Sequence, residues 1–238
     1  MNKTTGRRRL QRCCRAAIAG IIGLFCLTAY ADDNGRHDGA GFEIAPINSR
    51  PEGRTYREWA VRWWQWALET PGSRNAIFDT AACDAAQRGS VWFIGGSIFG
   101  TGPIVRSCVL PYGKSLFFPI INSGYFAFPD DPPAQRTETY VREQAKCAIG
   151  DIEVKIDGTT VRNPKQYVER SPLFKVTLPR DNQLGLDPML LSPSVDEGYY
   201  LFLEPLRAGT HSINWRATCG GYKQDVHYTL IVRRDRDD

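Results

Sequence analysis

Two adjacent carboxylates, Asp130 and Asp131, are the residues of this sequence best placed for acid–base chemistry. They follow an aromatic segment and precede Pro132 and Pro133, so we expect their backbone to be extended and rigid. A glycoside hydrolase holds two carboxyl groups about 5 to 9.5 Å apart, and Ca²⁺ also binds carboxylate oxygens. The pair is therefore a candidate hydrolase or calcium centre, although we favour a solvated turn bounded by prolines.

His211 is the second candidate, because histidine titrates near neutral pH and serves as a general base or a ligand contact. Strand alternation places it on one face with Ile213 and Trp215, beside a turn at Gly209. We favour a structural role at a strand edge. The sequence has no H-E-x-x-H or G-x-S-x-G motif, and so it contains neither the helical zinc-protease motif nor that serine-hydrolase motif.

Gly113, Lys114 and Ser115 imitate the end of a phosphate-binding loop. The pattern fails because Cys108 occupies the position that requires glycine, and because the residues that follow form a strand pattern instead of a helix. The sequence therefore predicts no nucleotide site, and we expect neither a metal ion nor another cofactor.

An amphipathic helix rich in tryptophan is the most distinctive element of the chain. Thr55 and Glu58 form a capping-box pattern that starts it, and Pro71 with Gly72 ends it. Tyr56 and the apolar residues that follow it share one stripe of this helix. This spacing predicts that the helix packs on a sheet.

Four tryptophans within residues 59–66 exceed what one narrow stripe needs. Trp59 and Trp63 lie on the stripe, whereas Trp64 lies toward its edge, and Trp66 follows. We favour a helix that closes an open side of the fold, with Trp63 buried. The alternative is that Trp64 and Trp66 form an exposed platform for a sugar ring, with Trp64 the better candidate.

Cysteine usage indicates an oxidising compartment. Three of the seven cysteines lie in a predicted leader, and the remaining four are Cys83, Cys108, Cys147 and Cys219. An even number in an exported chain predicts two disulfides. Three pairings are possible, and we favour Cys83 with Cys108, which closes the shorter loop, and Cys147 with Cys219. The absence of a C-x-x-C pair argues against a zinc site.

The N-terminus has the form of a secretory signal peptide over residues 1–31. A basic segment precedes an apolar run, and Ala29 to Ala31 supply a small-x-small cleavage site. The apolar run is too short to cross a bilayer comfortably, and no later segment approaches that length. We therefore predict an exported protein, periplasmic or extracellular, without a stable membrane span after cleavage.

The distribution of charge argues against a nucleic-acid partner. The formal net charge of the whole chain is +4, but six of its 30 Lys and Arg residues and none of its 26 Asp and Glu residues lie in the leader. The remainder is slightly acidic, so no basic footprint for a polyanion is left.

The predicted fold is mainly β: a β-sandwich, immunoglobulin-like or jelly-roll-like, with the tryptophan-rich helix and one further helix over residues 137–148. We expect a flexible arm at residues 32–54, one domain at 55–234, a charged tail at 235–238 and a long loop at 180–198. Eight short strands are expected, at residues 91–94, 104–110, 116–122, 152–156, 173–178, 199–203, 211–218 and 225–232.

Five motifs carry a resemblance: WAVRWWQW, VWF, FFPIIN, SPLF and GTHSI, which begin at residues 59, 91, 117, 171 and 209. With them the chain resembles a family of exported bacterial proteins of unassigned function, over most of residues 50–232. The resemblance implies an exported, mostly β protein. It implies no reaction, ligand or catalytic residue.

These observations favour a non-enzymatic function. We expect an exported, disulfide-stabilised binding or cell-envelope interaction protein, with a carbohydrate or another envelope component as its partner. Two alternatives remain open, namely a secreted hydrolase that uses paired carboxylates and a structural envelope protein without a small ligand. The sequence identifies no catalytic residue, and it leaves the oligomeric state undetermined.

Overall fold

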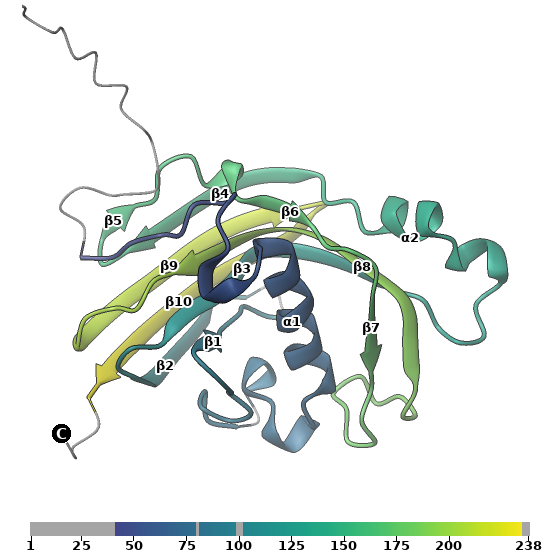
Figure 1. The fold of residues 1–238 in the computed structure, drawn as a ribbon, viewed down its shortest axis with the longest axis horizontal. Helices are drawn as coiled ribbons and strands as arrows, with labels where there is room; N and C mark the ends of the chain where they lie inside the picture. Colours follow the sequence, from purple (N-terminus) through teal and green to yellow (C-terminus); the bar gives the residue numbers. More distant parts are fainter. Residues whose placement is uncertain (1–40, 80, 99–101, 235–238) are drawn as a thin grey trace, which may run out of the picture. The chain divides into compact units, whose positions relative to one another are not determined.

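The computed structural model describes residues 41–79, 81–98 and 102–234. The predicted leader, residues 32–40 of the predicted arm and the tail at 235–238 lie outside this described part. Within it the chain is mainly β, with ten strands in two sheets and two α-helices (Figure 1). The predicted mainly-β sandwich with two helices is confirmed.

The first sheet is built around two long strands. Here β3 (Ser115–Phe126) pairs antiparallel with β8 (Leu190–Leu203). The short strand β1 (Val91–Phe93) pairs parallel with β3, and β6 (Val168–Arg170) and β7 (Phe174–Thr177) both pair with β8. The predicted loop at 180–198 is wrong for its second half, because β3 continues to Phe126 and gives β8 a partner as far as Ser194.

The second sheet has the order β2, β10, β9, β4, β5. Its strands are β2 (Ile104–Pro111), β4 (Ile149–Ile156), β5 (Thr159–Thr160), β9 (Gly209–Cys219) and β10 (Tyr222–Arg233). β2 runs parallel to β10 and forms one edge, while the other neighbours are antiparallel. This order places β2 and β10, the first and the last strand of this sheet along the chain, beside each other.

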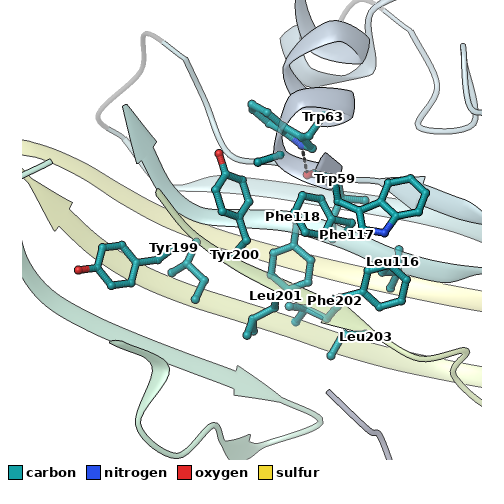
Figure 2. Packing of buried hydrophobic residues seen from close by; sticks show 14 of the residues in the cluster. Trp59, Trp63, Leu116, Phe117, Phe118, Tyr199, Tyr200, Leu201, Phe202 and Leu203 are labelled. Atoms are coloured by element: carbon teal, nitrogen blue, oxygen red, sulfur yellow. Dashed lines mark hydrogen bonds between the residues drawn. The ribbon is translucent and has the colours of Figure 1, made fainter. Parts of the chain in front are cut away.

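The core explains why β3 has an unbroken apolar run. Phe117 points toward the helix side, with its ring 5.9 Å from that of Tyr56, whereas Phe118 points to the second sheet, with its ring 5.1 Å from that of Trp215 (Figure 2). A strand covered on both faces is apolar at successive positions and does not alternate. The first sheet, to which β3 belongs, therefore lies between the helix and the second sheet.

The helix α1 (Tyr56–Glu69) begins with the predicted capping box, in which Thr55 and Glu58 cap each other. Trp63 is buried, as predicted, and its Nε1 donates to the Ile94 carbonyl at 2.9 Å. The helix α2 (Glu138–Gln144) is shorter than the predicted 137–148, because Ala145 already caps its end. No helix of the described residues is long and apolar enough to cross a membrane.

Residues 41–54, predicted to belong to a flexible arm, are part of the folded unit. Ile44 is fully buried and forms an antiparallel bridge with Leu203, and Phe42 is buried beside it. The apolar segment around Ile44 therefore gives the end of β8 a further, short pairing partner. Short 3₁₀ helices fill this and other connections: Pro51–Gly53, Gly72–Arg74, Ala76–Phe78, Pro133–Arg136 and Pro164–Gln166.

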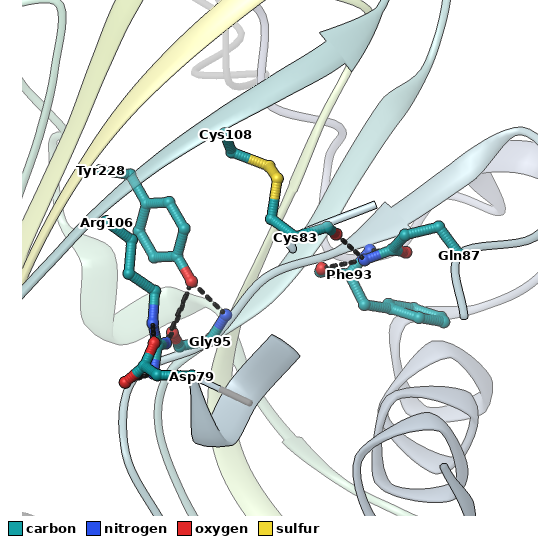
Figure 3. The surroundings of a disulfide bond; sticks show 8 residues. All are labelled: Asp79, Cys83, Gln87, Phe93, Gly95, Arg106, Cys108 and Tyr228. Carbon is teal, nitrogen blue, oxygen red and sulfur yellow. Dashed lines mark hydrogen bonds and ion pairs between the residues drawn. A yellow bond between two sulfur atoms is a disulfide. The ribbon is translucent and has the colours of Figure 1, made fainter. Parts of the chain in front are cut away.

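Both disulfides join the favoured pairs. Cys83 is bonded to Cys108 of β2, and Cys147 to Cys219 at the end of β9, with Cα atoms 5.6 and 5.5 Å apart. The first ties the connection after Phe78 to the edge strand of the second sheet (Figure 3). The second ties the end of the α2 segment to the same sheet. Such a framework fits an exported chain.

Replacing Cys83 and Cys108 together by serine is expected to lower the free energy of unfolding by up to about 3.5 kcal/mol, because the unfolded chain regains the entropy of a 25-residue loop. Urea unfolding of the oxidised proteins measures it. The matched Cys147→Ser, Cys219→Ser variant opens a 72-residue loop and should lose about 1 kcal/mol more. Unchanged unfolding midpoints in both variants would contradict the expectation.

Candidate functional site

The candidate carboxylates Asp130 and Asp131 lie in a turn after β3. Asp131 Oδ2 accepts a hydrogen bond from the Phe128 amide at 2.8 Å, and its own amide donates to the Phe128 carbonyl at 3.2 Å. Asp130 is exposed. The carboxylate that a hydrolase would need for substrate is thus engaged by the turn's own backbone.

His211 closes another turn. Its Nδ1 lies 2.7 Å from Asp157 Oδ2, and its Nε2 lies 2.9 Å from the Arg207 carbonyl oxygen. Asp157 also accepts from the Ser212 amide, and it adopts a left-handed φ of 48° in the tight turn before Gly158. Since both ring nitrogens already have protein partners, the geometry leaves neither free to activate a nucleophile.

Trp64 is buried, so the alternative of an exposed platform with Trp64 as the better candidate is wrong for this residue. Its side chain is 5% exposed, and its ring lies 5.1 Å from that of Trp63 and 4.9 Å from that of Phe126. That alternative rests on the position of Trp64 toward the edge of the apolar stripe. Instead β7 and β8 continue beside α1, so that a wider arc of the helix is covered (Figure 1).

Trp64 leads to a buried carboxylate that sequence analysis missed. Its Nε1 donates to Asp196 Oδ1 at 2.8 Å, and the Tyr200 hydroxyl donates to Oδ2 at 2.7 Å. Tyr200 in turn accepts from Asn122 at 3.1 Å. Asp196 is 1% exposed, and burial raises the pKa of its carboxyl to about 7, although both donors oppose that shift.

This cluster lies in the interior of the fold, and the Asp196 carboxylate receives its hydrogen bonds from within the protein. The sequence signal is weak: Asp196 lies an even number of residues from Ser194 and Tyr200, which also face inward in β8. An acid with inward strand parity suggests a buried polar contact. This alternation of inward and outward residues is hard to recognise in the sequence, because the first part of residues 180–198 has no regular hydrophobic pattern.

An open groove of about 560 Å³ runs along α1, on a side of the helix that does not include Trp64. We call it the α1 groove. Its size falls within the range of small-ligand sites. Three aromatic side chains line it, Trp59 and Trp66 from α1 and Phe93 from β1. The groove is completed by Glu52, Arg54, Arg62, Gln65, Glu69, Thr70, Pro71, Arg74, Ala86, Arg88, Gly89, Ser90 and Val91.

Trp66 is the predicted site residue that lies in this groove. Its ring is half-buried, 5.6 Å from that of Phe93 and 6.3 Å from that of Trp63. Its Nε1 is buried and has no hydrogen-bond partner among the described residues. Because this N–H is buried, the candidate contact for a bound ligand is the exposed part of the indole ring that lines the groove.

The charges around the groove are unbalanced toward positive. Arg62, Arg74 and Arg88 are exposed, and none of them forms an ion pair within the described residues. The two acids are already engaged, because Glu52 accepts from the Ser90 hydroxyl at 2.8 Å and Glu69 accepts from a backbone amide of β7 at 2.9 Å. The free guanidinium groups favour an anionic ligand.

Arg54 adds a fourth cation at the start of α1, with its guanidinium carbon 5.3 Å from the centre of the Trp59 ring. This stacked arrangement holds the side chain over the aromatic floor. As for metals, no group of three or more His, Cys, Asp or Glu side chains in residues 41–79, 81–98 and 102–234 is arranged to hold an ion.

No family model and no curated protein matches the chain. Solved structures with some similarity include that of PbICP-C in complex with falcipain-2, at 9% identity and a TM-score of 0.26, over 61% of this chain and 100% of that one. A cysteine protease inhibitor from Entamoeba histolytica matches at 14% identity and a TM-score of 0.20, over 55% and 94% of the two chains. Similarity at this level assigns no function.

Proposed function

We propose that this protein is an exported carbohydrate-binding protein whose α1 groove holds an acidic sugar chain. The observation that carries the proposal is the placement of the half-buried Trp66 ring among arginines that have no ion-pair partner in the described residues. The face of an indole ring packs against the C–H face of a sugar ring.

The arginines specify the charge of the ligand. A guanidinium group presents a planar fork of donors that matches a carboxylate or a sulfate. Arg62 lies on α1 one turn before Trp66, whereas Arg74 and Arg88 come from the two connections beside the helix. Anionic groups on successive sugar units can therefore meet cations while one ring rests on the indole.

The test is calorimetric titration with trigalacturonic acid, a carboxylated trisaccharide, and with neutral maltotriose. Wild-type protein is expected to bind the acidic trisaccharide at least tenfold more tightly, because each charged hydrogen bond contributes about 1.5 to 3 kcal/mol. The affinity should fall as salt concentration rises, since these arginines are exposed.

The double variant Arg62→Gln, Arg74→Gln should bind trigalacturonic acid at least tenfold more weakly while it unfolds normally, because both side chains are exposed. Arg180→Gln is the matched control, since Arg180 is also exposed but does not line the groove. Trp66→Ala should weaken binding by a similar factor. Equal affinity of the double variant and the control would refute the proposal, and so would equal binding of the neutral sugar.

A further inference from the structure

The strand β2 is an edge with a free side. Among the described residues β2 pairs only with β10, and no backbone hydrogen bond joins its other side to another described residue. Its outward side chains Val105 and Val109 are 78% and 45% exposed. Such an edge offers unpaired amides and carbonyls to another extended chain.

A second groove follows this edge, and we call it the β2 groove. Its volume is about 840 Å³. One side is β2 itself, the opposite side is the connection around Cys83 together with Trp92 of β1, and two arginines stand at the end of β10. The lining residues that matter here are Cys83, Asp84, Trp92, Val109, Arg233 and Arg234.

The opposite side of the groove is fixed in place. The disulfide joins Cys83 to Cys108, on the strand across the groove (Figure 3). Arg106 points inward from β2, donates to the carbonyls of Gly95 and Gly96 at 2.6 and 3.0 Å, and forms an ion pair with Asp79. The connection therefore stays beside β2 and leaves a channel along the edge.

We propose that the β2 groove binds an extended peptide segment of a partner protein, which adds to the second sheet as a strand beside β2 and carries acidic residues at one end. Strand addition supplies backbone hydrogen bonds whatever the peptide sequence, and side chains at alternate positions supply specificity. Apolar residues of the peptide would lie beside Val105 and Val109, as neighbours in a sheet do.

The acidic end follows from Arg233 and Arg234. Neither forms an ion pair within the described residues, and Arg234 only stacks over Tyr112, 4.6 Å from the ring centre. Among the described residues that line the groove, two are arginines and one, Asp84, is an acid. A second copy of this chain fits less well, because its own whole sheet would have to enter beside the connection that Cys83 anchors.

The test uses a fluorescein-labelled peptide of alternating threonine and valine that ends in two aspartates, measured by fluorescence anisotropy. Two further peptides carry N-methyl groups on its odd or its even amides. Only one set of amides can face β2, so one N-methylated peptide should lose at least tenfold in affinity and the other should bind like the parent. No binding of the parent peptide, or equal binding of all three, would overturn the proposal.

Protein variants locate the site. Val109→Lys should weaken binding at least tenfold, whereas the matched control Val168→Lys, at a 40% exposed valine of β6 in the other sheet, should not. Arg233→Gln with Arg234→Gln should reduce affinity for the acidic peptide but not for one that ends in two asparagines. A wild-type dimer in sedimentation velocity that Val109→Lys abolishes would overturn the proposal in favour of self-pairing. None of these outcomes depends on whether the α1 groove binds a sugar, so the two proposals are tested separately.

Discussion

Trp64→Ala is expected to lower the free energy of unfolding by about 4 to 8 kcal/mol. Loss of a buried indole leaves a cavity that costs about 3 to 5 kcal/mol. The change also removes the donor to Asp196 Oδ1, and a buried acceptor without its partner costs about 1 to 3 kcal/mol. Urea unfolding followed by circular dichroism measures the loss.

Trp64→Phe separates the two contributions, because it keeps most of the packing and removes only the N–H donor. It should cost about 1 to 3 kcal/mol. If the free energies of unfolding of both variants lie within about 1 kcal/mol of wild type, Trp64 is not buried as described above. The alternative from the sequence, an exposed Trp64 that contacts a ligand, would then hold.

The second large effect is a loss of stability with rising pH that depends on Asp196. Burial raises the pKa of this carboxyl to about 7 in the folded protein, whereas an unfolded aspartate titrates near 3.9. Between these values the folded state holds a proton that the unfolded state has released. The stabilisation is therefore complete below pH 4, falls as pH rises, and is lost above about pH 7.

The size of this effect is about 4 kcal/mol, at 1.36 kcal/mol for each pH unit between the two pKa values. Asp196→Asn is the matched variant, because an amide oxygen still accepts from Trp64 and does not ionise. Stability curves in urea at pH 4 to 8 should converge at low pH and diverge by several kcal/mol at pH 8, with the variant more stable. Parallel curves for the two proteins would contradict a buried, proton-linked Asp196.

Some elements could be predicted because their signals are local. The capping box at Thr55 and Glu58 sets the start of α1, and it needs only four neighbouring residues. The pairing of Cys83 with Cys108 follows from a short loop. In each case the residues that decide the structure lie close together in the chain.

Other features depend on contacts between distant segments. Trp64 is buried because β7 and β8 flank α1, and no periodicity within the helix reports that. The sequence predicts a flexible arm around Ile44, because its partner Leu203 is more than 150 residues away. The burial of Asp196 is likewise not evident from its neighbours, since one of its donors, Trp64, comes from α1 more than 130 residues away.

The α1 groove is an intermediate case. Trp66 was a candidate from the sequence, since it is part of a helix with more indoles than a core stripe requires. The sequence does not identify the arginines that give the groove its charge, because Arg74 and Arg88 lie in connections whose path depends on the tertiary fold. The sequence thus predicted the aromatic half of the site and left its electrostatic half open.

The central claim is that Trp66 contacts an acidic sugar chain in the α1 groove. The direct measurement is the ¹H–¹⁵N correlation spectrum of the six tryptophan indoles, with the Trp66 signal assigned by its loss in Trp66→Phe. Titration with trigalacturonic acid should shift the Trp66 Nε1–H signal and leave those of Trp64 and Trp215 in place, and maltotriose should shift none of them. A Trp66 signal that stays fixed throughout the trigalacturonic acid titration would contradict the claim.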